Sequence, residues 1–275
     1  MSEAAAAATS GASAERRAVS VEVEDLHVSF GRQAVLRGLT FAVEPGEIFA
    51  LMGPSGSGKS VLLRTVMGLM RADRGRVRID GRDASDPATH RSIVTSMVFQ
   101  AGALFNSLSV FDNLAFYPRE HRLCDAATLR QKVERCLEVF NLADAARKTP
   151  AELSGGMRKR VAIARALMME PQLILYDEPT SELDPVTAAN IAEVIALLKE
   201  QFAVTSVVVT HDRDLALSIC QRVGVIFEGE LAALETPADL RELDNARLQD
   251  FLDPAIDPRH PRFKQAGRNG GGEER

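Results

Sequence analysis

The sequence predicts an α/β fold with a mostly parallel sheet, and two observations support this prediction. The first is a set of short apolar runs with the composition of strands buried on both faces. They lie at residues 46–52, 93–100, 173–177 and 205–210. The second is the helical pattern expected between them, at 59–70 and 185–201, because alternation of strand and helix favours a parallel sheet covered by helices. With 275 residues, 45% of them hydrophobic, the chain is long enough to bury a full core.

Further segments of the chain add to this predicted fold. Residues 21–30 alternate apolar and polar side chains and reach 35–43 through a turn, which predicts an N-terminal antiparallel β subdomain that 76–80 could join. Residues 107–169 have a mostly helical pattern, in which Ser109 and Asp112 have the spacing of a helix-starting box. After Glu230 we expect a short hairpin and one or two small helices.

The amino-acid composition limits the possible classes of protein and indicates the domain organisation. Residues 1–18 are rich in alanine and serine, which predicts a disordered lead rather than a signal peptide. We expect the main domain at 19–240, an extension at 241–275, and folded structure from about 19 to 263. The net charge of −5 argues against nucleic acid as the main partner. No apolar run reaches the ~18 residues that span a bilayer, so any membrane role is expected to be peripheral. The three scattered cysteines indicate reduced thiols.

The first chemical motif is GPSGSGKS at residues 53–60, which fits the phosphate-binding pattern G-x-x-x-x-G-K-[ST]. Its glycines allow successive backbone N–H groups to point at phosphate oxygens, while the lysine bridges the β- and γ-phosphates and the serine ligates Mg²⁺. A chance glycine-rich turn is the alternative, but a strand precedes the motif and a helix follows it. The motif therefore predicts ATP and Mg²⁺ as ligands. The candidate residues are Gly53, Pro54, Ser55, Gly56, Ser57, Gly58, Lys59 and Ser60.

The second motif is a pair of carboxylates, Asp177 and Glu178, at the end of the apolar run LILYD. Asp177 is expected to hold Mg²⁺ through water, and Glu178 is the candidate general base or water-positioning group. Such a pair is also a common cap or turn feature. The phosphate-binding motif upstream favours the catalytic interpretation.

The third motif is LSGGM at residues 153–157. Ser154, Gly155 and Gly156 precede a helix that carries four basic residues, and such a helix N-terminus can bind a second anion. Because one chain has no use for two γ-phosphate sites, the motif suggests a homodimer that sandwiches ATP. A plain serine-capped helix explains the motif equally well.

In this order and spacing, the three motifs resemble those of the ATP-binding subunits of ABC transporters, and the resemblance covers roughly residues 20–235. It implies that Gln100 senses Mg²⁺ and the permease, that His211 contacts the γ-phosphate, and that Asp184 of SELD works across the dimer interface. It also implies that Phe30 stacks on adenine. Taken alone, Phe30 fits a core position and His211 fits a surface loop.

Two positions depart from the family pattern, Met157 where most members have Gln and Glu182 where a small residue is usual. The Met157 signature, the segment 99–116 and PREH at 118–121 resemble the Mla/Mce group, which implies phospholipid cargo. That resemblance further implies permease subunits, an Mce-domain or periplasmic lipid-binding partner, and a peripheral location on the cytoplasmic face of the inner membrane. An importer ATPase for a small solute remains open. An ABC ATPase acting on DNA or ribosomes would have two ATPase units or a long coiled coil.

The segment from Gln100 to about Asn113 is the candidate docking site for the permease. Its apolar residues exceed what a short loop needs, although a buried core loop is the alternative. These residues are Ala103, Leu104, Phe105, Leu108 and Phe111.

Overall fold

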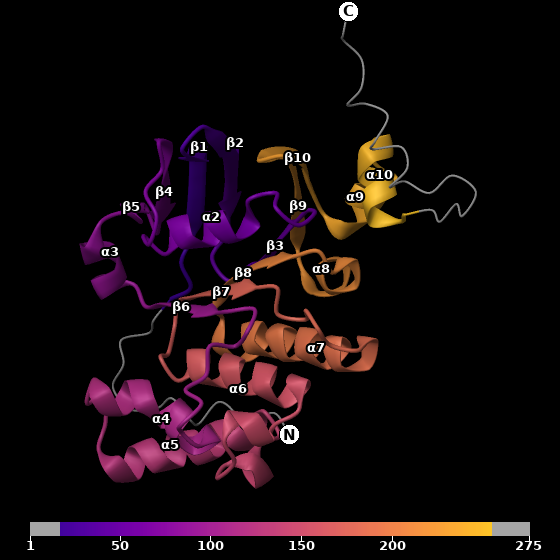
Figure 1. The fold of residues 1–275 in the computed structure, drawn as a ribbon. Helices are drawn as coiled ribbons and strands as arrows, with labels where there is room; N and C mark the ends of the chain where they lie inside the picture. The colour runs from indigo at the N-terminus through magenta and orange to yellow at the C-terminus, as the bar shows by residue number, and fades with distance from the viewer. Residues whose placement is uncertain (1–16, 255–275) are drawn as a thin grey trace, which may run out of the picture.

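The computed structural model describes residues 17–254, and its centre is a six-stranded sheet with the order β10-β9-β3-β8-β7-β6 (Figure 1). Neighbouring strands from β9 to β6 pair in parallel, and β10 pairs antiparallel with β9. This confirms the predicted α/β fold with a mostly parallel sheet. The strands are β3 (Ile48–Met52), β6 (Thr95–Val98), β7 (Leu173–Asp177), β8 (Thr205–Thr210), β9 (Arg222–Phe227) and β10 (Glu230–Glu235).

Strand β3 shows why the central strands are apolar throughout. Ile48, Ala50 and Met52 pack in the cluster that includes the large helices, whereas Phe49 and Leu51 pack in the cluster that includes the second sheet. All five side chains are buried, since both faces of the sheet are covered.

The second sheet is antiparallel where its strands pair and has the order β2-β1-β4-β5. It lies with helix α2 on one side of the central sheet (Figure 1). The Phe41 ring of β2 stacks on Phe49 of β3 with the centroids 5.0 Å apart, which joins the two sheets. The elements on this side are β1 (Val21–Phe30), β2 (Gln33–Val43), α2 (Lys59–Val66), β4 (Arg74–Ile79), β5 (Arg82–Asp83) and α3 (Pro87–Ser92).

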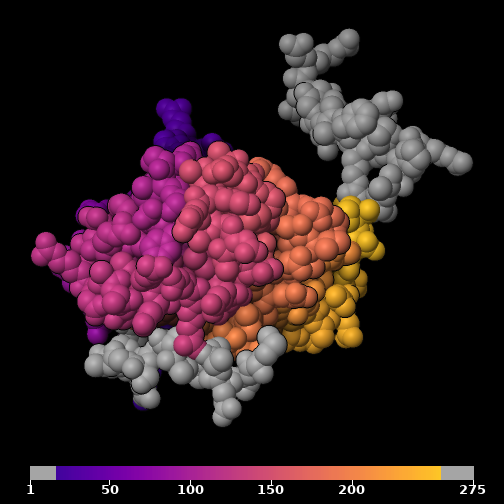
Figure 2. Space-filling view, turned by 90° about the horizontal axis from the view of Figure 1, so that it is seen from below, coloured from indigo at the N-terminus to yellow at the C-terminus, as the bar shows by residue number. Residues whose placement is uncertain are grey.

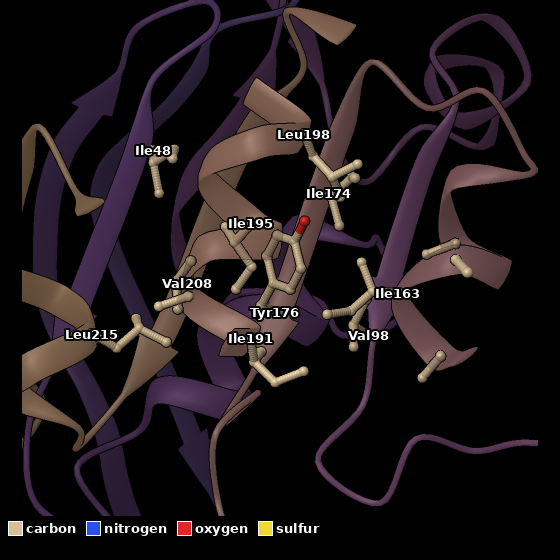
Figure 3. Packing of buried hydrophobic residues seen from close by; sticks show 14 of the residues in the cluster. Ile48, Val98, Ile163, Ile174, Tyr176, Ile191, Ile195, Leu198, Val208 and Leu215 are labelled. Atoms are coloured by element: carbon tan, nitrogen blue, oxygen red, sulfur yellow. The ribbon is translucent and has the colours of Figure 1, made fainter. Parts of the chain in front are cut away.

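Helices cover the opposite face of the central sheet, with α6 and α7 nearest to it and α4 and α5 outside them (Figure 1). Seen from below, the magenta and pink residues of the helical segment form much of this surface (Figure 2). The ring of Tyr176 in β7 fills the space between sheet and helices and lies beside Ile163 and Ile195 (Figure 3). The helical elements are α4 (Val110–Glu120), α5 (Ala126–Val139), the short 3₁₀ turns η1 (Ala143–Ala145) and η2 (Pro150–Glu152), α6 (Gly155–Leu167) and α7 (Pro185–Phe202). Helices thus lie where the sequence predicts the insert at 107–169; the exact domain boundaries stay predictions.

Several element ends differ from expectation for local reasons. Helix α2 ends at Val66 rather than near residue 70, because Gly68 has a φ of +67° and a Cβ there would come 2.6 Å from the carbonyl of Ala84. Strand β6 is shorter than 93–100. The C-terminal hairpin consists of β9 and β10, so it begins at Arg222, ahead of the expected start at Glu230.

The last described elements are α8 (Arg213–Ile219), α9 (Pro237–Glu242) and α10 (Ala246–Leu252). The Arg213 guanidinium donates to the carbonyl of Leu252, and Phe251 packs edge-on against Phe227 of β9. Within residues 17–254, no helix is long and apolar enough to cross a membrane. Residues 1–16 and 255–275 lie outside the described part, so the predicted lead and flexible end are not tested there.

The segment between β6 and α4 is held by one buried amide, Asn113. Its Oδ1 accepts from the backbone N–H of Phe105, and its Nδ2 donates to the carbonyls of Phe105, Leu108 and Ser109 at 3.0–3.3 Å. Ser109 also caps α4 by accepting from Asp112 N–H, as the predicted box requires. Because Asn113 is fully buried, water cannot replace these contacts.

Replacing Asn113 with alanine should therefore lower the free energy of unfolding by about 2–4 kcal/mol, since it removes the acceptor of the Phe105 N–H and the side-chain donor to the Leu108 carbonyl. Denaturant unfolding of the purified variant measures this. Asn106→Ala is the matched control, because Asn106 is exposed in the same segment and should change stability by less than about 0.5 kcal/mol. Equal effects of the two substitutions would contradict the role given to Asn113.

Candidate nucleotide-binding and catalytic site

The predicted catalytic residues lie at the carboxyl ends of three adjacent parallel strands, β3, β8 and β7. Strand β3 runs into the glycine-rich loop at 53–58, β7 ends at Asp177, and β8 ends at Thr210 just before His211. Parallel strands end at one edge of a sheet, so residues 53, 177 and 211 converge although they are far apart in sequence.

The loop at 53–58 needs glycine at two positions in particular. Gly58 has a φ of +102°, and a Cβ there would come 2.5 Å from a methyl of Leu36. At Gly53 a Cβ would come 2.4 Å from the carbonyl of Ile226. The backbone can therefore curl before helix α2 only without side chains at these positions. Pro54, Ser55 and Gly56 form the exposed rim, which is open to a ligand.

Lys59 begins helix α2 and turns its side chain back over this loop. Its Nζ donates to the carbonyls of Gly53 (2.8 Å) and Pro54 (3.2 Å), and it lies 3.5 Å from Oε1 of Glu178. The residue is only 6% exposed. The ammonium group thus occupies the centre of the curled loop. The buried hydroxyl of Ser57 has no hydrogen-bond partner among the described residues, which leaves a donor inside the loop.

Ser60 and Asp177 form the oxygen pair that the sequence predicts as Mg²⁺ ligands. Ser60 Oγ donates to Asp177 Oδ1 at 2.9 Å. Burial raises the pKa of Asp177 above 3.8, and the Ser60 hydroxyl opposes this shift. Hydroxyl and carboxylate oxygens suit a hard cation such as Mg²⁺. Within residues 17–254 no group of three or more His, Cys, Asp or Glu could hold a metal ion, so the pair fits an ion whose other ligands are phosphate and water oxygens.

Glu178 is held by donors from the neighbouring strand. Its Oε2 accepts from Thr210 Oγ1 (3.2 Å), from the backbone N–H of His211 (3.2 Å) and from His211 Nδ1 (2.9 Å). The residue has a φ of +49°, a left-handed conformation that non-glycine residues adopt rarely and that concentrates at functional sites. Only 12% of its side chain is exposed, whereas 59% of the His211 side chain is exposed. A carboxylate in this position can accept a proton from a water that reaches it.

The other predicted site residues lie at separate places on the surface. Phe30 at the end of β1 is 51% exposed, so the alternative of a core position is wrong. Gln100 follows β6 and is exposed. Ser154 caps α6 by accepting from Met157 N–H, and Asp184 caps α7 by accepting from the N–H groups of Val186 and Thr187. In the described part of the chain, side-chain contacts join Lys59 to Glu178, Glu178 to His211, and Ser60 to Asp177. No hydrogen bond or ion pair among the described residues joins these five to Phe30, Ser154 or Asp184.

Sequence reasoning missed two polar contacts near this edge. Thr180 Oγ1 donates to Asp212 Oδ2 at 2.7 Å, which ties the chain after β7 to the cap of α8. Lys159 of α6, which reads in sequence as one of four basic residues on a helix, is buried and reaches the carbonyls of Gln100 and Glu178. A lysine's sequence context does not reveal burial, so no signal in the sequence could have found it.

Comparison with known proteins identifies the family. The family model described as ABC transporter matches residues 36–181, more than half of the chain. The chain belongs to the ABC transporter family. It is 37% identical over 243 residues to the intermembrane phospholipid transport system ATP-binding protein MlaF of Escherichia coli, covering 86% of this chain and 90% of MlaF.

Other relatives are described as transport proteins for different substrates. The chain is 40% identical to the Fe(3+) ions import ATP-binding protein FbpC of Agrobacterium fabrum, with 86% of this chain and 67% of FbpC covered. It is 37% identical to the probable ribonucleotide transport ATP-binding protein mkl of Mycobacterium leprae, with 85% and 69% covered. The chain thus spans about two thirds of these two ABC proteins and nearly all of MlaF.

Solved structures agree on the fold of this ABC protein. One is a dimeric, post-hydrolysis state of an ATP-binding cassette bound to ADP and Pi, with a TM-score of 0.70, 31% identity, and 79% of this chain and 98% of that chain covered. Another is a nucleotide-free ATP-binding cassette from an ABC transporter, with a TM-score of 0.73, 26% identity, and 86% and 100% covered. This ABC subunit therefore binds and hydrolyses ATP, with Mg²⁺ as the usual companion ion.

The raised pKa of Asp177 predicts a cost in stability for the nucleotide-free protein. An aspartate whose pKa rises on folding stabilises the fold while it is protonated, and this contribution is lost as pH rises through the folded pKa. Asp177→Asn should therefore raise the melting temperature without nucleotide by a few degrees near pH 8. The difference in melting temperature between Asp177→Asn and the wild type should become smaller as pH falls.

Thermal melts across pH measure this effect, and Asp144→Asn, at an exposed aspartate, is the control that should leave the melting temperature unchanged. A lower melting temperature for Asp177→Asn at high pH would show that the carboxylate stabilises the fold.

Proposed function

We propose that this chain is the ATP-hydrolysing subunit of a membrane complex that moves phospholipid between membranes, and that it works as a homodimer bound to permease subunits at the cytoplasmic face of the inner membrane. The main support for the proposed ATPase chemistry is the position of Glu178, which lies between Lys59 and His211. Cargo and partners are supported by the similarity to MlaF over nearly its full length.

At the site, the backbone N–H groups of residues 53–58 bind the phosphates, and Lys59 gives up its carbonyl acceptors to bridge the β- and γ-phosphates. Mg²⁺, when bound by Ser60 and Asp177, neutralises charge on the phosphates. Glu178 accepts the proton of the attacking water, and His211 contacts the γ-phosphate. Gln100 senses the ion, and Phe30, half exposed at the end of β1, offers its ring to adenine.

The dimer is supported by the position of the serine-glycine motif. Ser154 caps the 13-residue helix that Gly155 and Gly156 begin, and among the described residues no hydrogen bond or ion pair joins these three to residues 53–60 of the same chain. They are available for the nucleotide on a second copy, and Asp184 lies beside them in space: a Cβ on Gly156 would come 2.4 Å from Thr187, which Asp184 caps. The solved cassette that is dimeric with ADP and Pi has the same fold.

The permease is proposed to dock on the segment from Gln100 to about Asn113 and on the aromatic surface that Phe105 of this segment forms with Phe116, which are 41% and 38% exposed. The rings of Phe105 and Phe116 lie 4.6 Å apart, and the guanidinium of Arg165 lies 5.6 Å from the Phe105 centroid. Exposed rings that are fixed by Asn113 and Arg165 give a rigid apolar surface, which suits a helix from a partner.

Glu178→Gln should keep ATP binding within about threefold and lower kcat at least ~100-fold, because the phosphate site survives and proton transfer does not. Lys59→Ala should weaken binding itself. Nucleotide affinity and phosphate release are measured on the purified protein, with Glu200→Gln on the exposed face of α7 as the matched control. Turnover of Glu178→Gln at the wild-type rate would refute the assignment of the base.

The cargo is tested in a strain that lacks this gene. We expect sensitivity to detergent and an altered phospholipid distribution between membranes, with iron and sulfate uptake unchanged. Wild-type protein should restore the barrier, and Glu178→Gln, produced at the same level, should not. Failure to grow on limiting iron or sulfate with an intact barrier would replace phospholipid with a small solute, as in the importer relatives.

A further inference from the structure

Lys159 is a buried lysine on helix α6 whose three N–H donors all have partners. Its Nζ donates to the carbonyl of Gln100 (2.6 Å), to the carbonyl of Glu178 (3.3 Å) and to Ser181 Oγ (3.2 Å). Ser181 Oγ in turn donates to the same Glu178 carbonyl at 2.9 Å. The residue is 8% exposed, so these contacts replace its hydration.

These acceptors belong to two segments that carry proposed catalytic residues. Gln100 follows β6, whereas Glu178 and Ser181 follow β7. No other side chain among those described donates to both the Gln100 and the Glu178 carbonyl. Helix α6 is thereby fastened to the peptide of the candidate base and to the peptide of the candidate Mg²⁺-sensing residue.

The charges around Lys159 explain why an ammonium group is tolerated there. Burial lowers the pKa of Lys159, and the carboxylates of Glu182, Glu178 and Asp177 oppose this shift. Glu182 is an exposed residue, and the three hydrogen bonds of Lys159 go to the Gln100 and Glu178 carbonyls and to Ser181.

We propose that Lys159 is a positioning residue for ATP hydrolysis, which fixes the backbone of Glu178 and of Gln100 to helix α6. The inference rests on the proposed role of Glu178 as base. In the described part of the chain, no hydrogen bond or ion pair joins Lys159 to residues 53–60, so its loss should leave ATP binding intact and misplace the base.

The test measures kcat and KM for ATP in Lys159→Met and Lys159→Gln. Methionine fills the space of the lysine side chain without a hydrogen-bond donor, whereas glutamine retains an N–H donor on a shorter side chain. We expect Lys159→Met to lower kcat by about 10- to 100-fold, with KM within about twofold, because small displacements of a catalytic group cost this much. Lys159→Gln should recover a substantial part of kcat. Lys132→Met, which removes an exposed lysine paired with Glu170, is the control and should change neither constant.

A lysine that only fills space gives the opposite ranking, with methionine at least as active as glutamine, and that ranking overturns the proposal. So does a rise in KM that equals the fall in kcat. If Lys159→Met does not fold, Ser181→Ala is the deciding variant, because it removes one acceptor of the Lys159 ammonium group. An unchanged kcat in this variant would overturn the proposal, and a fall in kcat of a few-fold at constant KM supports it. Glu178→Gln is assayed in parallel, so that failure of the base assignment is seen separately.

Discussion

Strands β3, β8 and β7 run in parallel and end at the same edge of the central sheet, and the catalytic site depends on this shared direction. The glycine-rich loop, the carboxylate pair and His211 each follow one of these strands. The pairing register of the strands places Met52 opposite Thr210 and Asp177 opposite Val209, so the segments that follow these strands start close together. The apolar residues that fill both faces of these strands hold the register, so the core and the site are specified together.

The charges at this edge are arranged so that a triphosphate has to displace existing contacts. Lys59 donates to its own loop and lies next to Glu178, and His211 donates to the same carboxylate through Nδ1. Phosphate oxygens would compete for Lys59, and a γ-phosphate would compete for His211. With Glu178 as the proposed base, the loss of these neighbours would free its carboxylate to accept a proton from water, and nucleotide binding would thereby be linked to activation of the base.

Much of this fold and of the central site could be predicted, because both are encoded in local patterns. The apolar runs identify buried strands, and the motif at 53–60 and the pair at 177–178 identify their chemistry without any tertiary information. Strand β9 was missed because Arg222 and Gly224 weaken its apolar pattern, although its pairing with β3 and β10 supplies the stabilising contacts. Asn113 and Lys159 were beyond sequence reasoning for a different reason. Each is an ordinary polar residue on a helix, and its role follows from burial: Lys159 lies against loops that are far from it in sequence, and the Asn113 amide lies against the loop just before its own helix.

Helix α6 connects the parts of the molecule that a transporter has to move together. Its first residue is capped by Ser154 at the proposed dimer face, and Lys159 near its middle holds the Glu178 and Gln100 carbonyls. Arg165 in its last turn donates to the carbonyls of Gly102 and Ala103, on the segment that leads to the aromatic surface. Helices move as rigid rods because their backbone hydrogen bonds are internal. In the proposed dimer, a displacement of Ser154 on ATP-driven closure would therefore be carried along the rod both to the Glu178 peptide and to the segment proposed to bind the permease.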